Sequence, residues 1–347
     1  MSYTAKQWMV KEQTGDHLDI DKTFELVTKQ LNVGDLKEGE VIAKITYISN
    51  DPAQRAWIHK KNIERRLYRP PIRDGEPMEA FGVSEIVESR NPEYQKGDQV
   101  FGNIFWADYC ILPVGSIVMK VPGDPTDIIT LGISGLAAYF GLMNVGAVTP
   151  KDQTIVVSSA AGSTGSITCQ IAKNILGIKH VVGVAGSDAK CERLTKEFGC
   201  DVALNYKSPT FKQDFEAATP DDIDVFMDNT AGEVTDLALM RMKDFGRVVI
   251  SGAISYYDEY DKKGDISRGS WMQIICHKIR IEGFIVFQFA EQFAKALGDL
   301  GLWAQEGKVK LVKQVWDAKV EDVPKGMQKL LRGENTGKLI TKLVAGR

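Results

Sequence analysis

A glycine-rich segment near the middle of the chain is the first place where residue types and spacing suggest chemistry. It has Gly162 and Gly165 on either side of Ser163 and Thr164, and Ala160 stands where a dinucleotide fingerprint usually has its first glycine. Glycine at these points lets the backbone approach a pyrophosphate, which the N–H groups of a helix N-terminus bind. The segment therefore predicts a dinucleotide site at these four residues. The alternative is an ordinary glycine turn that binds no nucleotide.

The residues after the next apolar run bear on which nicotinamide nucleotide is bound. An NAD-binding protein usually places Asp or Glu at the end of this strand, where it hydrogen-bonds the ribose 2′-hydroxyl. Here the run ends at Gly186 and Ser187, and Asp188 is interpreted as part of a helix cap. Lys190 follows where an ammonium group could face a 2′-phosphate, although most helix lysines are simply solvated. Chiefly because the acid is missing, we predict NADP(H) as the cofactor.

These residues need a framework, and the periodicity of apolar residues predicts one. The first third of the chain is predicted to be β-rich up to a boundary at 121–125, with strands at 41–47, 81–87 and 98–102. Beyond it, helical patterns such as 164–176 and 188–198 alternate with short apolar strands. These strands are expected at 154–158, 181–185, 202–204, 223–227, 247–250 and 281–287. The alternation predicts an α/β fold with a doubly wound parallel sheet.

Composition and charge exclude several classes of protein. The 347 residues are 44% hydrophobic and 26% charged, as in soluble globular proteins, and the length suggests two domains. The net charge is -3 and no run of Lys or Arg stands out, so we expect no nucleic-acid partner. We find no secretory signal and no stretch of ~18 uninterrupted apolar residues. The five cysteines are scattered, as in a reduced cytoplasmic protein without membrane association.

Several short motifs are spread over most of the chain, and they are specific only in combination. They lie at Asp51-Pro52 with Arg55, and at 135–141, 160–166, 186–190, 205–207, 228–229, 252–255 and 333–338. Together they resemble the zinc-independent medium-chain dehydrogenase/reductase superfamily, most closely its leukotriene dehydrogenase/prostaglandin reductase and plant double-bond reductase branch. The resemblance implies a Rossmann NADP-binding domain at 126–303. It also implies a β-rich, GroES-like catalytic domain at 1–125 that is completed by 304–347.

The resemblance also implies roles for residues at matching positions. Lys190 and Tyr206 look like contacts of the adenosine 2′-phosphate, beside Gly186 and Ser187. Asn229 resembles a cofactor contact after the fourth strand of the Rossmann sheet. The loop along the nicotinamide ribose corresponds to Gly252, Ala253, Ile254 and Ser255, and the C-terminal residue that reaches back to the cofactor corresponds to Asn335.

One departure from the resembled family concerns the substrate. Relatives often have Tyr directly after Asp-Pro, at a position that faces the substrate, whereas this chain has Ala53 followed by Gln54. We therefore expect a substrate that differs from theirs.

The positions at which related alcohol dehydrogenases hold zinc lack the necessary ligands here. A catalytic zinc in those enzymes is bound by two Cys and one His. The segment 47–51 contains no Cys, the segment 78–82 contains no His, and no Cys lies between Arg90 and Tyr109. The four His residues are widely separated along the chain. We expect no metal site.

Without a metal, reduction of an activated C=C bond is the simplest chemistry for such a protein. Hydride from NADPH would reach the β-carbon of an enal or enone, and a hydroxyl group would stabilise the charge on the carbonyl oxygen. By resemblance, Tyr257 is the expected catalytic donor, and Tyr256 beside it is the competing candidate. Both tyrosines could instead be loop aromatics that fill space. Cys110 could react with electrophiles, but we interpret it as a small core residue.

Two other functions remain open at this stage. A related zinc-free branch performs NADPH-dependent quinone reduction, which requires the same cofactor and no metal. A non-catalytic protein that senses NADPH is the third possibility, although any turnover with an enone would exclude it. The last predicted strand is apolar and would lie at a sheet edge, so we expect a homodimer.

Overall fold

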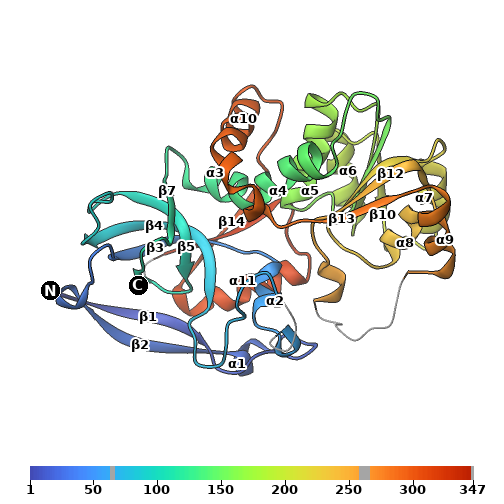
Figure 1. The fold of residues 1–347 in the computed structure, drawn as a ribbon. Coiled ribbons are helices and arrows are strands. Elements are labelled where there is room, and N and C mark those ends of the chain that lie inside the picture. Colours follow the sequence, from blue (N-terminus) through green and yellow to red (C-terminus); the bar gives the residue numbers. More distant parts are fainter. Residues whose placement is uncertain (63–66, 258–265, 345–347) are drawn as a thin grey trace. The chain divides into compact units, whose positions relative to one another are not determined.

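The computed structural model describes residues 1–62, 67–257 and 266–344, and the chain divides into two compact units (Figure 1). Unit 1 contains Met1–Ile129 and Lys313–Arg347, and unit 2 contains Thr130–Val312. The mixed α/β class predicted from the sequence is confirmed, with a β-rich unit and a unit built on a parallel sheet.

Unit 1 is built on a seven-stranded sheet of order β14-β15-β3-β4-β5-β7, with β6 paired to β3, and on the hairpin β1-β2. Its strands are β1 (Ser2–Val10), β2 (Phe24–Asn32), β3 (Val41–Ser49), β4 (Glu79–Ser89), β5 (Gln99–Phe105), β6 (Tyr109–Leu112), β7 (Ile117–Lys120), β14 (Lys313–Ala318) and β15 (Lys338–Leu343). Its main helices are α1 (Ile20–Thr23), α2 (Ala53–Trp57) and α11 (Val323–Leu331). The sheet surrounds a core that includes Trp57, Met78 and Trp106.

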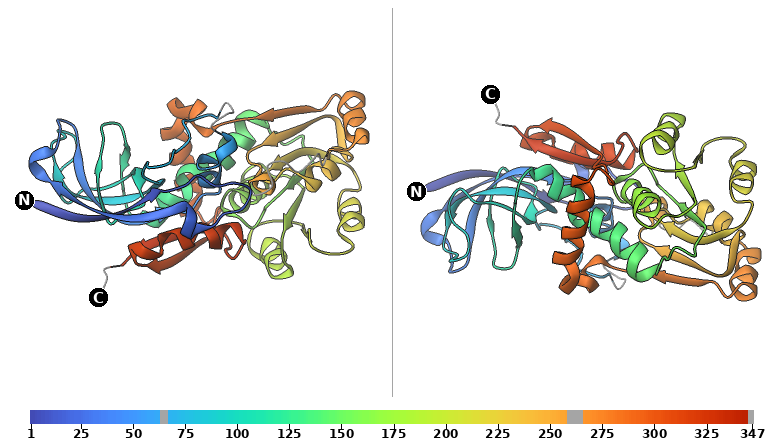
Figure 2. Two further views of the ribbon diagram at one scale, coloured as in Figure 1. Left: turned by 90° about the horizontal axis from the view of Figure 1, so that it is seen from below. Right: turned by 90° about the horizontal axis from the view of Figure 1, so that it is seen from above.

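The C-terminal segment of the chain is part of this sheet. Strand β15 pairs antiparallel with β3, with Ile340 opposite Ser49. Figure 2 shows these C-terminal strands in red near the blue N-terminal ones. A buried ion pair between Lys338 on β15 and Asp51 just after β3 adds a side-chain link between the two ends of the chain.

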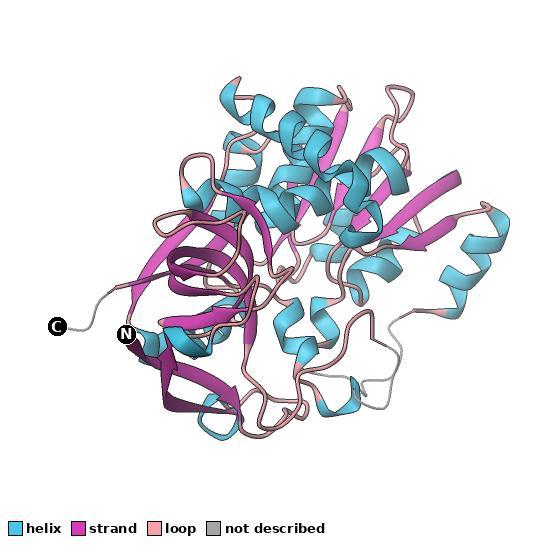
Figure 3. Ribbon diagram, turned by 60° about the vertical axis from the view of Figure 1, so that its left-hand side comes forward, coloured by secondary structure: helices cyan, strands magenta, loops and turns pink. Residues whose placement is uncertain are grey.

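Unit 2 is a six-stranded sheet of order β10-β9-β8-β11-β12-β13 in which all neighbours are parallel. The strands are β8 (Thr154–Val157), β9 (His180–Ala185), β10 (Val202–Asn205), β11 (Ile223–Asp228), β12 (Met242–Ile250) and β13 (Arg280–Gly283). The helices include α4 (Leu136–Phe140), α5 (Ser163–Gln170), α6 (Asp188–Glu197), α7 (Phe211–Ala218), α8 (Glu233–Leu239), α9 (Arg268–Cys276) and α10 (Phe293–Gln305), and Figure 3 shows helices on both sides of these strands. The order confirms the predicted doubly wound sheet: β9 and β10 follow on one side of β8, and β11 to β13 follow on the other side.

The last predicted strand, 281–287, is too long. Strand β13 ends at Gly283, and Val286–Gln292 form a 3-10 helix. Phe284 and Val286 turn into the hydrophobic core of unit 2, so an apolar run continues after the strand has ended. Apolar composition alone does not distinguish a short strand from a buried turn.

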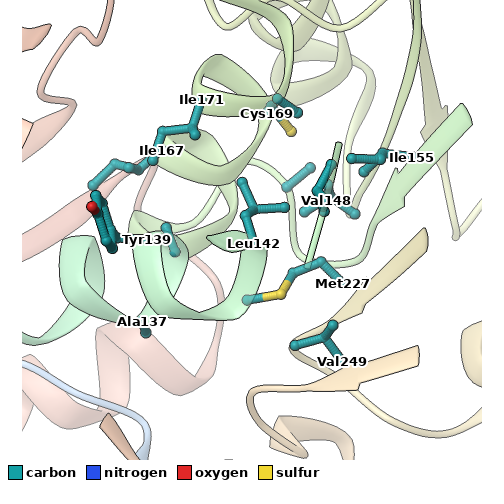
Figure 4. Close-up of a cluster of buried hydrophobic side chains, with 14 of the residues drawn as sticks. Ala137, Tyr139, Leu142, Val148, Ile155, Ile167, Cys169, Ile171, Met227 and Val249 are labelled. Carbon is teal, nitrogen blue, oxygen red and sulfur yellow. The ribbon is translucent and has the colours of Figure 1, made fainter. Parts of the chain in front are cut away.

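Unit 2 has two hydrophobic clusters, which take alternating residues of the sheet: one includes Ile155 and Met227, and the other includes Val156 and Phe226. Figure 4 shows Leu142, Ile155, Ile167, Met227 and Val249 packed together in the first cluster. The continuous helical segment Pro125–Val145 is long and apolar enough to cross a membrane, but 78% of its apolar window is buried inside the structure. Its hydrophobicity is therefore that of a core helix, and α4 within it packs against α5 and α10.

A buried histidine in unit 1 makes the stability of the fold depend on pH. His59, just after α2, is 1% exposed, and its Nε2 lies 3.7 Å from the Asp16 carboxylate. Burial and then the positive charge of Arg55 lower the pKa of His59 below its ordinary value, and Lys61 acts in the same direction. The folded state therefore favours the neutral ring, because a buried charge is costly.

We predict that stability falls as the pH falls through the ordinary histidine pKa of about 6.5. The unfolded chain binds a proton there before the folded chain does, so protonation favours unfolding. Urea unfolding at about pH 7.5 and about pH 5.5 should show a larger loss for the wild type than for His59→Gln. An equal loss in both proteins would show that His59 does not cause the effect.

Candidate cofactor site

The predicted cofactor residues of unit 2 follow the carboxyl ends of five strands, β8, β9, β10, β11 and β12. Because the strands are parallel, these ends lie at one edge of the sheet. Backbone hydrogen bonds join neighbouring loops at this edge: Ala160 N donates to Val184 O at 2.8 Å, and Tyr206 N donates to Ala185 O at 3.0 Å. The structure thus brings together the loop residues that lie far apart in the sequence.

The glycine-rich turn leads directly into helix α5. Gly162 is the N-cap residue and makes no side-chain capping bond, and Ser163, Thr164 and Gly165 form the first turn. A Cβ atom at Gly165 would lie 2.3 Å from Ser159 O and 2.6 Å from Ala160 Cα, so only glycine allows this close packing of helix on strand end.

The start of α5 fits the pyrophosphate of a dinucleotide. The Ser163 hydroxyl is buried and has no hydrogen-bond partner in the part of the chain that the structure describes. A buried polar atom without a partner is costly, and the N–H groups of a helix N-terminus attract an anion. A phosphate oxygen at this place would satisfy the Ser163 hydroxyl together with the N–H groups of the first turn.

Positively charged and phenolic groups gather after β9 and β10. Ser187 caps α6 by accepting from Lys190 N at 3.4 Å, and Asp188 accepts from Asn205 Nδ2 at 2.8 Å. Burial and then the charge of Lys207 lower the pKa of Lys190. Two ammonium groups therefore share one region, and the acid that follows β9 is already hydrogen-bonded to an amide.

Tyr206 completes this cluster. Its side chain is 49% exposed, and a Cβ atom at Gly186 would lie 3.0 Å from its ring. Lys207 Nζ lies 5.7 Å from the centre of the same ring. Lys207 is not among the residues predicted individually from the sequence, although its place directly after Tyr206 in the motif 205–207 is a signal that could have identified it.

Asn229 lies at the end of β11, beside the end of β8. Its backbone N donates to Ser158 Oγ at 2.7 Å, and its Nδ2 donates to Ser158 O at 2.8 Å. A Cβ atom at Gly252 would lie 3.1 Å from Asn229 O, so the loops after β11 and β12 are in close contact. The sequence analysis cited Asp228 only as part of a motif, whereas the structure buries its carboxylate at the same edge.

The two candidate tyrosines follow this contact. Residues Ile254–Tyr256 form a 3-10 turn after Gly252 and Ala253, and Ser255 N donates to Thr230 O at 3.1 Å. Tyr256 and Tyr257 are both partly buried, and residues 258–265 lie outside the described residues. The geometry of the turn does not separate the two candidates.

Asn335 and Ala53 belong to unit 1 and are therefore not among the residues gathered at the sheet edge of unit 2. Asn335 is buried, and its Nδ2 donates to Gly337 O at 2.8 Å. Ala53 begins α2, and the following Gln54 donates from Nε2 to Glu79 O at 3.0 Å.

The donor set does not fit a catalytic zinc. Among residues 1–62, 67–257 and 266–344, no group of three His, Cys, Asp or Glu side chains could hold a metal ion. Asp51, at the end of β3, is bonded to Lys338 and Ser49 instead. Burial raises the pKa of Cys110 to about 12, so its thiol is a poor source of the thiolate that zinc requires.

Comparison with known proteins gives the family. Residues 6–121 match the family described as N-terminal domain of oxidoreductase, and residues 163–300 match the family described as zinc-binding dehydrogenase. Prostaglandin reductase 1 of Mus musculus is 36% identical over 97% of this chain and 99% of its own length. The NADP(+)-dependent 2-alkenal reductase of Nicotiana tabacum is 34% identical over 96% of each chain.

A solved structure agrees with these relatives. CurA from Vibrio vulnificus in complex with NADPH has a TM-score of 0.89 and 25% identity, and the match covers 98% of this chain and 100% of CurA. Sequence relatives and fold neighbour thus cover nearly the whole chain and agree with the motifs described above. The chain belongs to the medium-chain dehydrogenase/reductase superfamily, in the branch that contains the prostaglandin reductases and the 2-alkenal reductases.

Proposed function

We propose that this protein is an NADPH-dependent reductase of C=C bonds conjugated to an aldehyde or ketone. The observation that carries the proposal is the group of residues that lie at the carboxyl ends of the strands of unit 2. There the N-terminus of α5 lies on the same edge as two lysines and a tyrosine, and Asp188, the acid that follows β9, accepts a hydrogen bond from Asn205. Relatives include a 2-alkenal reductase and an NADPH-dependent curcumin reductase, whose matches cover 96% and 89% of this chain.

We assign different parts of the cofactor to different residues at this edge. We assign the pyrophosphate to Gly162, Ser163, Thr164 and Gly165, because the helix start offers N–H donors and an unsatisfied hydroxyl. We assign the 2′-phosphate to Lys190, Tyr206 and Lys207, beside Gly186 and Ser187. We assign the nicotinamide ribose to Asn229 and the loop Gly252, Ala253, Ile254 and Ser255, and we assign Asn335 to the cofactor on the family resemblance alone.

The protein's contribution to the chemistry is to orient the substrate and to stabilise charge. Bound NADPH supplies a hydride for the β-carbon of the substrate. Negative charge then develops on the carbonyl oxygen, where a hydroxyl donor stabilises it, and a proton taken up by the α-carbon, which water can supply, completes the reduction. We assign this donor to Tyr257, which follows the 3-10 turn at the end of the nicotinamide loop. The donor set does not fit a zinc, so we propose that the reaction needs none.

A steady-state screen of enals, enones and quinones with NADPH and NADH in parallel tests the proposal. We expect turnover of enals or enones with a marked preference for NADPH. Turnover of quinones alone would replace the proposal by quinone reduction, and NADPH binding without any turnover would indicate a sensor.

We also propose that two copies of the chain form a homodimer through the edge strand β13. All four of its residues are exposed, and such an edge is a template for strand pairing. Trp271 and Ile275 on α9 add apolar side chains that are 61% and 69% exposed. Light scattering should give twice the chain mass of 38.4 kDa for the wild type, and less for Ile281→Lys. A monomeric wild type would contradict this assembly.

For the cofactor, we predict that Lys190→Ala and Lys207→Ala each raise the KM for NADPH and leave that for NADH nearly unchanged. A charge-assisted contact contributes roughly 1.5–3 kcal/mol, or about tenfold to a hundredfold in binding. Lys196→Ala is the matched control, since Lys196 lies on the same helix and pairs with Glu192. Equal losses with both cofactors would show that these lysines do not bind the 2′-phosphate.

For catalysis, we predict that Tyr257→Phe lowers kcat with little change in NADPH affinity, because the bond it removes is strongest in the transition state. Loss of one oxyanion donor typically costs roughly 10²–10³ in kcat, and we expect less, since a cofactor ribose hydroxyl can share the charge. Tyr256→Phe is the control. A reversed result would assign the role to Tyr256. If both variants keep the wild-type kcat while a deuteride isotope effect shows that the chemical step limits kcat, neither tyrosine is the donor.

A further inference from the structure

The carboxylate of Asp228 lies fully buried at the carboxyl end of β11, at the edge where the cofactor loops meet. Its Oδ1 accepts from Ser158 Oγ at 2.9 Å, Thr230 N at 2.9 Å, Thr230 Oγ1 at 3.3 Å and Ala231 N at 3.0 Å. Its Oδ2 accepts from Thr235 Oγ1 at 2.6 Å. A buried charge is tolerated only when it is hydrogen-bonded in this way, and each of its partners is thereby fixed in place.

One set of these bonds reaches Asn229. The Ser158 hydroxyl donates to Asp228 and accepts from Asn229 N at 2.7 Å. Asn229 Nδ2 then donates to Ser158 O at 2.8 Å. Because the carboxylate sets the direction of the Ser158 hydroxyl, it also orients the backbone N–H of Asn229, whose side chain is held by the Ser158 carbonyl next to it.

A second set reaches the loop that carries the tyrosines. The carboxylate holds Thr230 N and Ala231 N, and Ala231 has a positive φ of 62°, which is unfavourable for alanine. Thr230 O in turn accepts from Ser255 N at 3.1 Å, within the 3-10 turn before Tyr257. The carboxylate thus stabilises a strained backbone whose carbonyl anchors the next loop.

We infer that Asp228 is a positioning residue of the reductase site, which holds Asn229 and the turn before Tyr257 in the geometry that binds and uses the nicotinamide half of the cofactor. The inference rests on the proposed function for its catalytic part. Asp228 acts through these neighbours, and its own carboxylate is enclosed by hydrogen-bond donors.

The same strand provides a matched control. Asp224 lies near the amino end of β11 and also ties it to β8, where it accepts from Gln153 N at 3.0 Å and Thr154 N at 2.9 Å. It also accepts from Lys243 Nζ at 2.8 Å. Asp224 therefore has a comparable structural role at the opposite edge of the sheet, away from the cofactor loops.

The test compares Asp228→Ala, Asp228→Asn, Thr235→Val and Asp224→Ala in the full chain. NADPH affinity is measured by fluorescence titration, and Tm is measured by calorimetry. The values of kcat and KM are measured with the best enone or enal of the screen. We expect Asp228→Ala to weaken NADPH binding and to lower kcat by roughly tenfold to a hundredfold, since misplacement far from the reacting atoms can cost that much. Asp224→Ala should lower Tm and leave both other quantities within about twofold.

The conservative variants separate positioning from mere stability. Asp228→Asn keeps an oxygen acceptor, and its amide can donate to the Thr235 hydroxyl, so it should recover part of the lost affinity and kcat. Thr235→Val removes one hydrogen-bond donor to Asp228 and should weaken NADPH binding and lower kcat, each by a smaller factor than Asp228→Ala. This variant still tests the inference if Asp228→Ala does not fold. Equal losses of Tm at Asp228 and Asp224, with wild-type affinity and kcat in both, would overturn the inference.

The outcomes distinguish this inference from the proposed function. If the wild type binds NADPH but reduces no substrate, the proposed reaction fails while the affinities of the Asp228 and Asp224 variants still decide the positioning role. A wild type that does not bind NADPH would overturn both.

Discussion

Because the strands of unit 2 are parallel, every loop that follows a strand emerges at the same edge of the sheet, and the candidate site depends on this constraint. At this edge the turn before α5 presents backbone N–H groups, and the loops after β9 to β12 contribute side chains around it. The strand order reverses between β8 and β11, and in open α/β sheets ligands generally bind outside the carboxyl ends of the strands at such a point. Ser158, Asp228 and Asn229 lie at that point and connect the two strands by hydrogen bonds.

The charged groups after β9 and β10 bear on which nicotinamide nucleotide this site favours. Lys190 and Lys207 repel each other, which contributes to the lowered pKa of Lys190. A dianionic phosphate between them would relieve this repulsion, whereas a ribose hydroxyl would not. Asp188 accepts a hydrogen bond from Asn205. We propose that the two cations and this hydrogen bond underlie the preference for NADPH.

Unit 1 depends on contacts between distant parts of the chain. Strand β15 pairs with β3, and Lys338 bonds to Asp51, although the two residues are 287 positions apart. The same Asp51 also accepts a hydrogen bond from Ser49, so both of its carboxylate oxygens are bonded within unit 1. Without this pairing the C-terminal strands would have no sheet to join.

The sequence by itself determined the doubly wound unit, the glycine turn, the N-cap at Ser187 and the choice of NADP, because each depends on local periodicity or on residues close together in the chain. The last strand predicted from the sequence was too long, because Phe284 and Val286 are apolar residues of the hydrophobic core that follow the strand. Only the tertiary structure placed Lys207 where its charge lowers the pKa of Lys190, and gave the Asp228 carboxylate its hydrogen bonds to Ser158 and Thr235. These contacts join residues from different strands and helices, so their geometry exists only once the parallel sheet has brought the strand ends together.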